Sequence, residues 1–171
     1  IGPERKPGLI VGGSPSMIQV YELIDSAANS DLFVFLEGES GTGKELAARA
    51  IHYNSARADK PLIIADCGAK TETLINAELF GYVKGAFTGA YTDKVGLFEA
   101  ANNGTLFLDE ITNFKTHQQH SLLRVLQDKT IQRVGSSKDI KVDTRVIFAA
   151  SDLNERLAKG EFRKDLYYRI N

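Results

Sequence analysis

The segment Gly38-Glu-Ser-Gly-Thr-Gly-Lys44 has the residue types and the spacing of a phosphate-binding loop. It follows the apolar run 32–36 and precedes the helical pattern 45–51, which is the strand–loop–helix setting that such a loop needs. Its glycines allow backbone N–H groups to approach phosphate oxygens, and the helix N-terminus adds a partial positive charge. Lys44 is then expected to contact the β- and γ-phosphates of a nucleotide. The alternative is an ordinary glycine-rich turn, which the lysine and the two flanking elements disfavour.

Position 45 departs from the generic loop. The usual residue there is Ser or Thr, whose hydroxyl contacts Mg²⁺, whereas this chain has Glu45. The Mg²⁺ contact is therefore expected to come from elsewhere in the chain. The loop still predicts a continuous set of nucleotide-binding residues, namely Gly38, Glu39, Ser40, Gly41, Thr42, Gly43, Lys44 and Glu45.

Two carboxylates, Asp109 and Glu110, follow the apolar run 105–108. Asp109 is predicted to hold Mg²⁺, directly or through water, because this hard cation prefers oxygen ligands and keeps several waters. Glu110 would then polarise the water that attacks the γ-phosphate. Alone, such a pair is more simply a solvated strand end, but its place after a phosphate loop favours the chemical interpretation. A small-molecule kinase remains an alternative, although it would not need Glu110.

The rest of the chain alternates strand and helix patterns. Apolar runs and periodic apolar residues predict strands at 32–36, 62–65, 105–108 and 145–150, and helices at 15–29, 45–54, 73–80, 97–101, 116–126, 153–159 and 161–171. Thr116 and Gln119 form a capping-box pattern, and residues 131–142 indicate a hairpin or a long loop. The expected fold class is α/β, with a mostly parallel sheet and helices on both faces. Ligands bind at the carboxyl ends of such strands, where the phosphate loop, Asp66, Asp109-Glu110 and Ser151-Asp152 fall.

Length and composition indicate one globular domain. The chain has 171 residues, of which 43% are hydrophobic and 25% charged, and its net charge of −1 does not mark a nucleic-acid-binding protein. No membrane span or signal peptide is expected. The single cysteine, Cys67, excludes an internal disulfide and is interpreted as a small core residue of a cytoplasmic protein. The three histidines lack a metal-binding pattern and are expected at the surface or at an interface.

Five segments together resemble the central AAA+ ATPase domain of bacterial sigma-54 enhancer-binding proteins, which are transcriptional activators related to response regulators. They are Gly38–Glu45, Glu78-Leu-Phe-Gly81, Gly85-Ala-Phe-Thr-Gly-Ala90, Gly104-Thr-Leu-Phe-Leu-Asp-Glu110 and Phe162-Arg-Lys-Asp-Leu-Tyr-Tyr-Arg169. The resemblance begins near Leu9 and reaches the end of the chain, and Glu45 agrees with it. It implies an AAA+ P-loop NTPase core over residues 9–171. Residues 1–8, with two prolines and two glycines, are predicted to be a linker.

The resemblance implies an ATPase that uses ATP and Mg²⁺ and forms a hexameric or heptameric ring, with ATP between subunits. Hydrolysis would move one loop that engages sigma-54 and remodels the closed RNA polymerase complex, and its residues are Gly85, Ala86, Phe87, Thr88, Gly89 and Ala90. Phe87 and Thr88 would make the main contact. An aromatic residue among glycines suits a mobile, exposed anchor; without the family, a hairpin with a buried Phe87 would be preferred. Residues 132–141 match a second, supporting loop.

Arg163 and Arg169 match the candidate arginine fingers of the family, which would neutralise charge on the γ-phosphoryl group in a neighbouring subunit. From composition alone they would be solvated or paired with carboxylates such as Asp165. The resemblance also implies sensor residues at Ser151 and Asp152, where the family typically has Thr-Asn. A helical lid would follow, so the chain is expected to be a fragment that is a weak ATPase by itself. DNA would be contacted only through a further domain.

Asp66 replaces an asparagine that is thought, in this family, to hold the catalytic glutamate away from water. An ionised aspartate only accepts hydrogen bonds, so Asp66 and Glu110 would repel each other unless a proton or a cation intervenes. Either Glu110 is not latched, or the pair shares a proton; equally open is that the two never meet. The leading hypothesis is an ATPase that remodels sigma-54 polymerase. The alternative is a nucleotide-gated binding module with weak or no hydrolysis, because its sensor residues differ.

Overall fold

A parallel sheet forms the centre of the computed structural model, which describes residues 15–39, 41 and 43–170. The predicted linker over residues 1–8, the start of the domain at 9–14, and three single positions lie outside the described residues: Ser40, Thr42 and Asn171. The sheet contains β1 (Val34–Glu37), β8 (Arg145–Ala150), β5 (Thr105–Asp109) and β2 (Leu62–Asp66), in that spatial order. Every pairing in it is parallel, which confirms the predicted sheet.

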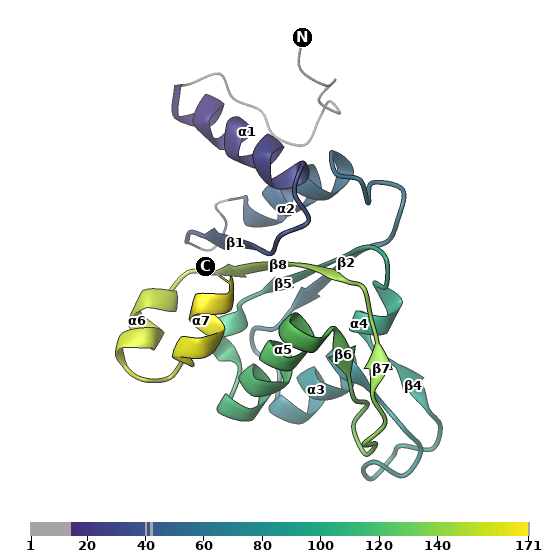
Figure 1. Cartoon of the computed structure of the whole chain (residues 1–171). Helices are drawn as coiled ribbons and strands as arrows, with labels where there is room; N and C mark the ends of the chain where they lie inside the picture. The colour runs from purple at the N-terminus through teal and green to yellow at the C-terminus, as the bar shows by residue number, and fades with distance from the viewer. Residues whose placement is uncertain (1–14, 40, 42, 171) are drawn as a thin grey trace.

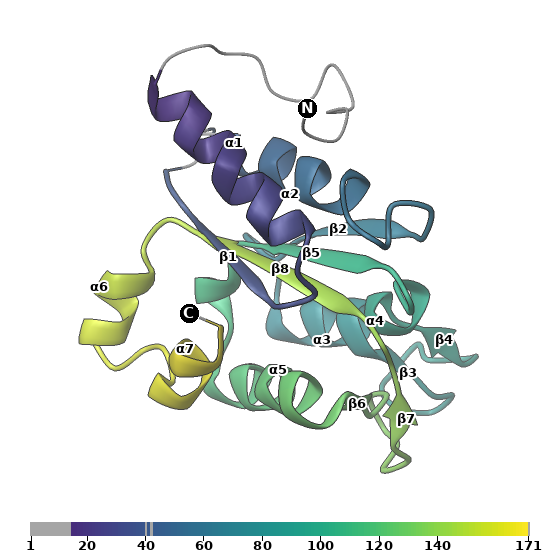
Figure 2. The ribbon, with the colours of Figure 1, turned by 45° about the horizontal axis from the view of Figure 1, so that its top comes forward.

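Helices cover both faces of this sheet (Figures 1 and 2). On one face lie α1 (Pro15–Ala28) and α2 (Lys44–Tyr53). On the other face lie α3 (Glu72–Phe80), α4 (Leu97–Ala100) and α5 (Thr116–Asp128), with the 3₁₀ turn η1 (Ile111–Asn113), α6 (Leu153–Ala158) and α7 (Lys164–Ile170). In the described part of the chain, no helix has the combined length and apolar character that a bilayer span requires.

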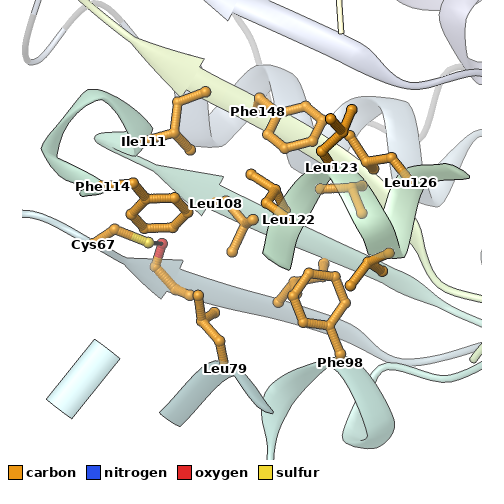
Figure 3. Close-up of a cluster of buried hydrophobic side chains, with 14 of the residues drawn as sticks. Cys67, Leu79, Phe98, Leu108, Ile111, Phe114, Leu122, Leu123, Leu126 and Phe148 are labelled. Atoms are coloured by element: carbon orange, nitrogen blue, oxygen red, sulfur yellow. Dashed lines mark hydrogen bonds between the residues drawn. The ribbon is translucent and has the colours of Figure 1, made fainter. Parts of the chain in front are cut away.

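Alternating side chains along the strands build two apolar cores, as expected for a sheet buried on both faces. Phe107, Ile147 and Ala149 pack with α1 and α2. Leu106, Leu108 and Phe148 point the other way, into a larger cluster with residues of α3, α4, α5 and η1. Figure 3 shows this larger cluster, with Cys67 at its margin. Cys67 is 2% exposed, which confirms its interpretation as a core residue, and this burial raises the pKa of its thiol to about 12.

Two predictions at the level of single residues are wrong. The first turn of α5 begins at Lys115, whose N–H donates to Gln118 Oε1 at 2.8 Å, so Thr116 and Gln119 do not form the cap. His52 is not at the surface but fully buried. Its Nε2 donates to the Lys60 carbonyl oxygen at 3.0 Å, and its Nδ1 accepts from the Thr105 hydroxyl at 2.8 Å. The cap is a local alternative that lies one residue earlier, whereas His52 is buried because Thr105, 53 residues away in sequence, supplies one of its partners.

Two short hairpins extend from the edge of the molecule opposite α6 and α7 (Figures 1 and 2). One consists of β3 (Gly81–Tyr82) and β4 (Lys94–Val95) and carries the loop 83–93. The other consists of β6 (Thr130–Ile131) and β7 (Ile140–Lys141), which confirms the hairpin alternative for 131–142. A bridge from Tyr82 to Val134 joins the two hairpins, so they form one structural unit.

Gly96 fixes the base of the first hairpin. A Cβ at this position would lie 2.3 Å from the Gly81 nitrogen and 2.4 Å from the Phe80 carbonyl carbon. We expect Gly96→Ala to cost about 3 kcal/mol of the free energy of unfolding, because neither backbone atom can move aside. Gly160→Ala is the control: with φ +73° and no atom within 4 Å, it should cost only about 1 kcal/mol for the left-handed conformation. Equal losses in urea unfolding would contradict the steric role of Gly96.

Candidate functional site

The carboxyl ends of the four parallel strands meet along one edge of the sheet. Asp66 is in register with Asp109, which is in register with Ala149, and Ala150 is in register with Glu37. Two hydrogen bonds extend the connections past the strands: Gly38 N–H donates to Ala150 O at 3.3 Å, and Cys67 N–H donates to Asp109 O at 2.9 Å. The sheet therefore brings together the phosphate loop, Asp66, Asp109-Glu110 and Ser151, as the sequence predicts.

The phosphate loop has the open backbone that its glycines predict. Gly41 and Gly43 have φ of 81° and 87°, and no atom lies within 4 Å of a Cβ added to either. Gly43 begins α2, so the helix N-terminus faces the loop. Lys44 Nζ donates to the carbonyl oxygens of Gly38 at 2.5 Å and Glu39 at 3.3 Å. The ammonium group thus lies over the loop, where phosphate oxygens would replace these carbonyls.

Glu45 is held away from this loop by its own helix. Its Oε1 accepts from Arg49 Nη2 at 3.0 Å, one turn further along α2. The carboxylate is exposed and paired on the helix surface. This arrangement agrees with the expectation that a Mg²⁺ contact would come from elsewhere.

Glu110 adopts a left-handed backbone conformation directly after β5. Its φ and ψ are 61° and 44°, a conformation that costs a residue other than glycine about 1–2 kcal/mol. Its N–H donates to Asp109 Oδ1 at 3.0 Å. The following turn is anchored by Ile111 and Phe114, both buried in the larger core cluster (Figure 3). Core packing therefore holds Glu110 in an unfavourable conformation at the strand end, which is typical of functional positions.

Asp66 and Glu110 flank the same glycine. A Cβ on Gly68 would lie 3.1 Å from Asp66 Oδ1 and 3.4 Å from Glu110 Cγ. Asp66 Oδ1 accepts from the Gly68 N–H at 2.9 Å. Both side chains therefore border Gly68, and the Asp66 carboxylate is engaged by a backbone N–H, so direct interaction of the two carboxylates stays a prediction.

These carboxylates have the chemistry that a hard cation prefers. Asp109 and Asp66 end neighbouring strands in direct register. Among the described residues, no group of three or more His, Cys, Asp or Glu side chains forms a metal site by itself. The prediction that Asp109 holds Mg²⁺ therefore requires further ligands, such as oxygens of water or of a nucleotide phosphate.

Asp152 forms hydrogen bonds with the turn that follows Glu110 and with α6. Its Oδ1 accepts from the Thr112 hydroxyl at 2.6 Å, and its Oδ2 accepts from Arg156 Nε at 2.9 Å. Burial alone would raise the pKa of Asp152, but these hydrogen bonds hold it below its ordinary value. Ser151, by contrast, is exposed at the end of β8. The two predicted sensor residues therefore have different surroundings.

The two predicted arginine fingers are held by partners within the same chain. Arg163 makes a two-pronged ion pair with Asp165, at 2.9 and 2.7 Å, which lowers the pKa of Asp165 to about 2. Arg169 Nη2 donates to Leu126 O at 3.3 Å. The alternative of carboxylate pairing, stated from composition, is thus correct for Arg163.

A polar network that runs from the buried Thr112 and Gln119 to the exposed Glu161 has no counterpart in the sequence predictions. It consists of Thr112, Gln119, Arg156 and Glu161 together with Asp152. The sequence contains one sign that Gln119 is buried: it lies three residues before Leu122 and four before Leu123, on the apolar face of α5. An amide on an apolar face is buried and needs hydrogen-bond partners.

The loop predicted to contact a partner is compact. Gly85 N–H donates to Ala90 O at 2.8 Å, and Thr88 and Gly89 are exposed at its tip. Phe87 is half-buried and packs edge-on against Tyr82, with ring centroids 4.9 Å apart. Phe87 therefore lies between the two alternatives, neither fully exposed nor part of the core.

Comparisons with known proteins agree on one family. The model of the sigma-54 interaction domain matches residues 10–171. The Nif-specific regulatory protein of Herbaspirillum seropedicae is 53% identical over 163 residues, covering 95% of this chain and 30% of that protein. The transcriptional regulatory protein GlrR of Escherichia coli K12 is 49% identical over 169 residues, covering 98% of this chain and 38% of that protein. The chain thus spans about a third of the length of these relatives.

Solved structures give the same result. NtrX from Brucella abortus in complex with ATP superposes with a TM-score of 0.87 and 37% identity, over 95% of this chain and 35% of that chain. The P-loop NTPase domain of a sigma-54 activator from E. coli superposes with a TM-score of 0.63 at 21% identity, over 94% of this chain and 92% of that chain. The second comparison shows the fold alone. It confirms the predicted P-loop NTPase core.

The strain at Glu110 predicts a gain in stability when it is relieved. We expect Glu110→Gly to raise the free energy of unfolding by about 0.5–1 kcal/mol, since glycine removes the left-handed penalty but adds entropy to the unfolded chain. Lys129→Gly, at φ 54° and outside the site, is the matched control and should give a similar gain. Urea unfolding would measure both. A loss for Glu110→Gly beside a gain for Lys129→Gly would show that the Glu110 backbone is not strained.

Proposed function

The chain belongs to the sigma-54 interaction domain family, and from that premise we propose that it binds and hydrolyses ATP and acts on sigma-54 RNA polymerase. The observation that carries the proposal is the parallel register that aligns the phosphate loop, Asp66, Asp109-Glu110 and Ser151 along one sheet edge. Ligands of open parallel sheets bind at this edge. Relatives in the solved structures include NtrX with ATP and with ADP.

ATP binding uses the loop and the start of α2. Backbone N–H groups around Gly41 and Gly43 and the α2 N-terminus bind phosphate oxygens. Lys44 exchanges its contacts with loop carbonyls for contacts with the β- and γ-phosphates. Asp109 would hold Mg²⁺, and the cation would offset the phosphate charge when bound.

Hydrolysis depends on Glu110. Its carboxylate orients the attacking water and accepts a proton as the water oxygen bonds to the γ-phosphorus, while the bond to the bridging oxygen of ADP breaks. The fixed turn at Ile111 and Phe114 holds Glu110 in place for this step. Asp66, which also borders Gly68, is a second carboxylate that restrains Glu110 when a proton or a cation lies between them.

Arg163 and Arg169 act in the site of a neighbouring copy, in a ring of six or seven. There they neutralise charge on the γ-phosphoryl group. Arg163 must first leave Asp165, and an exposed ion pair of this kind is worth only about 0–1 kcal/mol. A phosphate with several negative charges competes readily for the guanidinium group.

The loop 85–90 contacts sigma-54 and couples hydrolysis to remodelling of the polymerase complex. Phe87 must leave Tyr82 to do so, and an aromatic pair contributes about 0.5–1.5 kcal/mol beyond its buried area. The second hairpin supports this loop, because a Cβ on Gly135 would lie 2.7 Å from Ala86 Cβ. Both hairpins therefore move together.

A nucleotide-gated binding module with weak hydrolysis is the second candidate function. It is favoured by one observation, the engagement of Asp152 with Thr112 and Arg156. A carboxylate held by two partners is less available to report the state of a phosphate. Turnover measured in the whole protein separates the two candidates.

Glu110→Gln should keep ATP binding and lose hydrolysis, because an amide is too weak a base to accept the proton from water. We expect turnover to fall about 100-fold or more, with ATP affinity by calorimetry changed less than about threefold. Lys44→Ala is the contrasting variant and should abolish tight ATP binding, since it removes the cation that lies over the phosphate loop. Persisting hydrolysis in Glu110→Gln would reject the role of Glu110.

Phe87→Ala should remove binding to sigma-54 while leaving ATP turnover within about twofold, because the loop lies far from the sheet edge that carries the phosphate loop (Figure 1). Tyr91→Ala is the matched control, an 80% exposed aromatic residue on the same hairpin. Capture of sigma-54 with an ATP transition-state mimic is the measurement. Undiminished capture by Phe87→Ala, or equal loss by Tyr91→Ala, would reject the specific contact.

A further inference from the structure

Gln119 connects the turn that follows Glu110 to the segment that carries Arg163. Its side chain is fully buried, and both ends of the amide are used. Nε2 donates to Phe114 O at 2.9 Å and to Glu161 O at 3.0 Å, and Oε1 accepts from the Arg163 N–H at 2.7 Å. One side chain thus satisfies three backbone groups from two segments that are far apart in sequence.

Both segments are themselves firmly anchored in the core. Phe114 closes the turn after Glu110 and is 3% exposed. Phe162 and Leu166, on either side of Arg163, are 3% and 0% exposed. The Arg163 backbone is therefore fixed between apolar anchors, and Gln119 sets its position relative to the Glu110 turn.

A second path joins the same two segments. The Thr112 hydroxyl donates to Asp152, Asp152 accepts from Arg156, and Arg156 Nη1 donates to Glu161 Oε2 at 2.9 Å. The Glu161 N–H also donates to Arg156 O at 2.9 Å. Both paths therefore end at Glu161, two residues before Arg163.

The geometry points to Gln119 as a positioning residue that orients Arg163 toward the nucleotide of a neighbouring subunit. This inference rests on the proposed function, in which Arg163 acts between subunits. The Arg163 guanidinium is on a flexible side chain, so its reach depends on where the backbone holds its Cα. A displacement of about 1 Å at a group that stabilises charge can lower a rate about 100-fold.

The same contacts link the two sites of one subunit. The turn that Gln119 binds follows Glu110 directly, so any shift of Glu110 during hydrolysis is transmitted to the Arg163 backbone. Each subunit then adjusts the arginine that it presents to its neighbour according to the state of its own site. The Gln119 amide is suited to this role because it is fully buried and hydrogen-bonded at both ends, so it has little freedom to absorb a shift.

The chain offers a matched pair of variants for a test. Gln118 is adjacent, 2% exposed, and also hydrogen-bonded, but its partners are Lys115, Glu72 and Asn76 rather than the Arg163 segment. In the whole protein, Gln119→Met should lower kcat for ATP about 10- to 100-fold with KM within about threefold. Gln118→Met should leave kcat within about threefold at a comparable loss of stability. Equal kcat losses would reduce Gln119 to a structural role and overturn the inference.

Mixed assemblies test the direction of the effect. Glu110→Gln subunits keep an intact Arg163, so mixing them with Gln119→Met subunits should restore turnover at the Gln119→Met sites. The opposite pattern would overturn the inference: no recovery with Glu110→Gln subunits, but recovery when Gln119→Met subunits are mixed with Arg163→Ala subunits. That pattern would show that Gln119 serves the nucleotide site of its own subunit. The mixture of Glu110→Gln and Arg163→Ala subunits tests the proposed function by itself, and its failure to recover would reject the shared site.

A folding failure is covered by a second variant. Gln119→Glu has nearly the same shape and keeps an acceptor for the Arg163 N–H, but its carboxyl group carries at most one proton, so at least one of Phe114 O and Glu161 O loses its donor. Like Gln119→Met, this variant should lower kcat with little change in KM. Mixing it with Glu110→Gln subunits should restore ATP turnover. Unchanged kcat in Gln119→Glu would overturn the inference.

Discussion

The parallel pairing of β5 with both β2 and β8 is the constraint on which the rest of the structure depends. It places Asp66, Asp109 and Ala149 side by side at one edge, and β1 adds the phosphate loop by pairing with β8. Because parallel strands share direction, every residue that follows a strand end falls on the same edge. The helices cover both apolar faces of the sheet and leave the edge at the carboxyl ends of the strands available for ligand binding.

Strain and packing compensate each other at this edge. Glu110 has a left-handed backbone, which is unfavourable in isolation. Ile111 and Phe114 recover more free energy by burial than this conformation costs, since each large apolar side chain contributes about 1.5–3 kcal/mol. The conformation is therefore maintained by the core beneath it. This explains why an acidic residue is held at a defined point rather than on a flexible loop.

The groups with proposed partners outside the chain are each held by weak internal contacts. Lys44 is held by loop carbonyls, Arg163 by an exposed carboxylate, and Phe87 by a single ring. Each contact is worth little compared with a phosphate or a partner surface. By contrast, the backbone that carries Arg163 is tied to the core by Gln119. Side-chain contacts that are easily exchanged suit a domain that changes its binding partners during a reaction cycle.

The sequence by itself determined the fold class, the strands and the positions of the phosphate loop and of Asp109-Glu110. These follow from local patterns, namely apolar runs, glycine spacing and the alternation of strands and helices. The first strand was misplaced slightly: β1 is Val34–Glu37 rather than 32–36, because its pairing with β8 begins at Val34.

Only the tertiary structure decided where polar side chains point. Gln119 has the local pattern of a helix cap but binds Glu161 and Arg163, and His52 is buried by contacts with Lys60 and Thr105. Asp152 turns to Thr112, more than thirty residues away in sequence. Periodicity reports which face of an element is apolar, but the partner of a buried polar group is a residue that folding brings near, and its identity is not encoded in the neighbouring sequence.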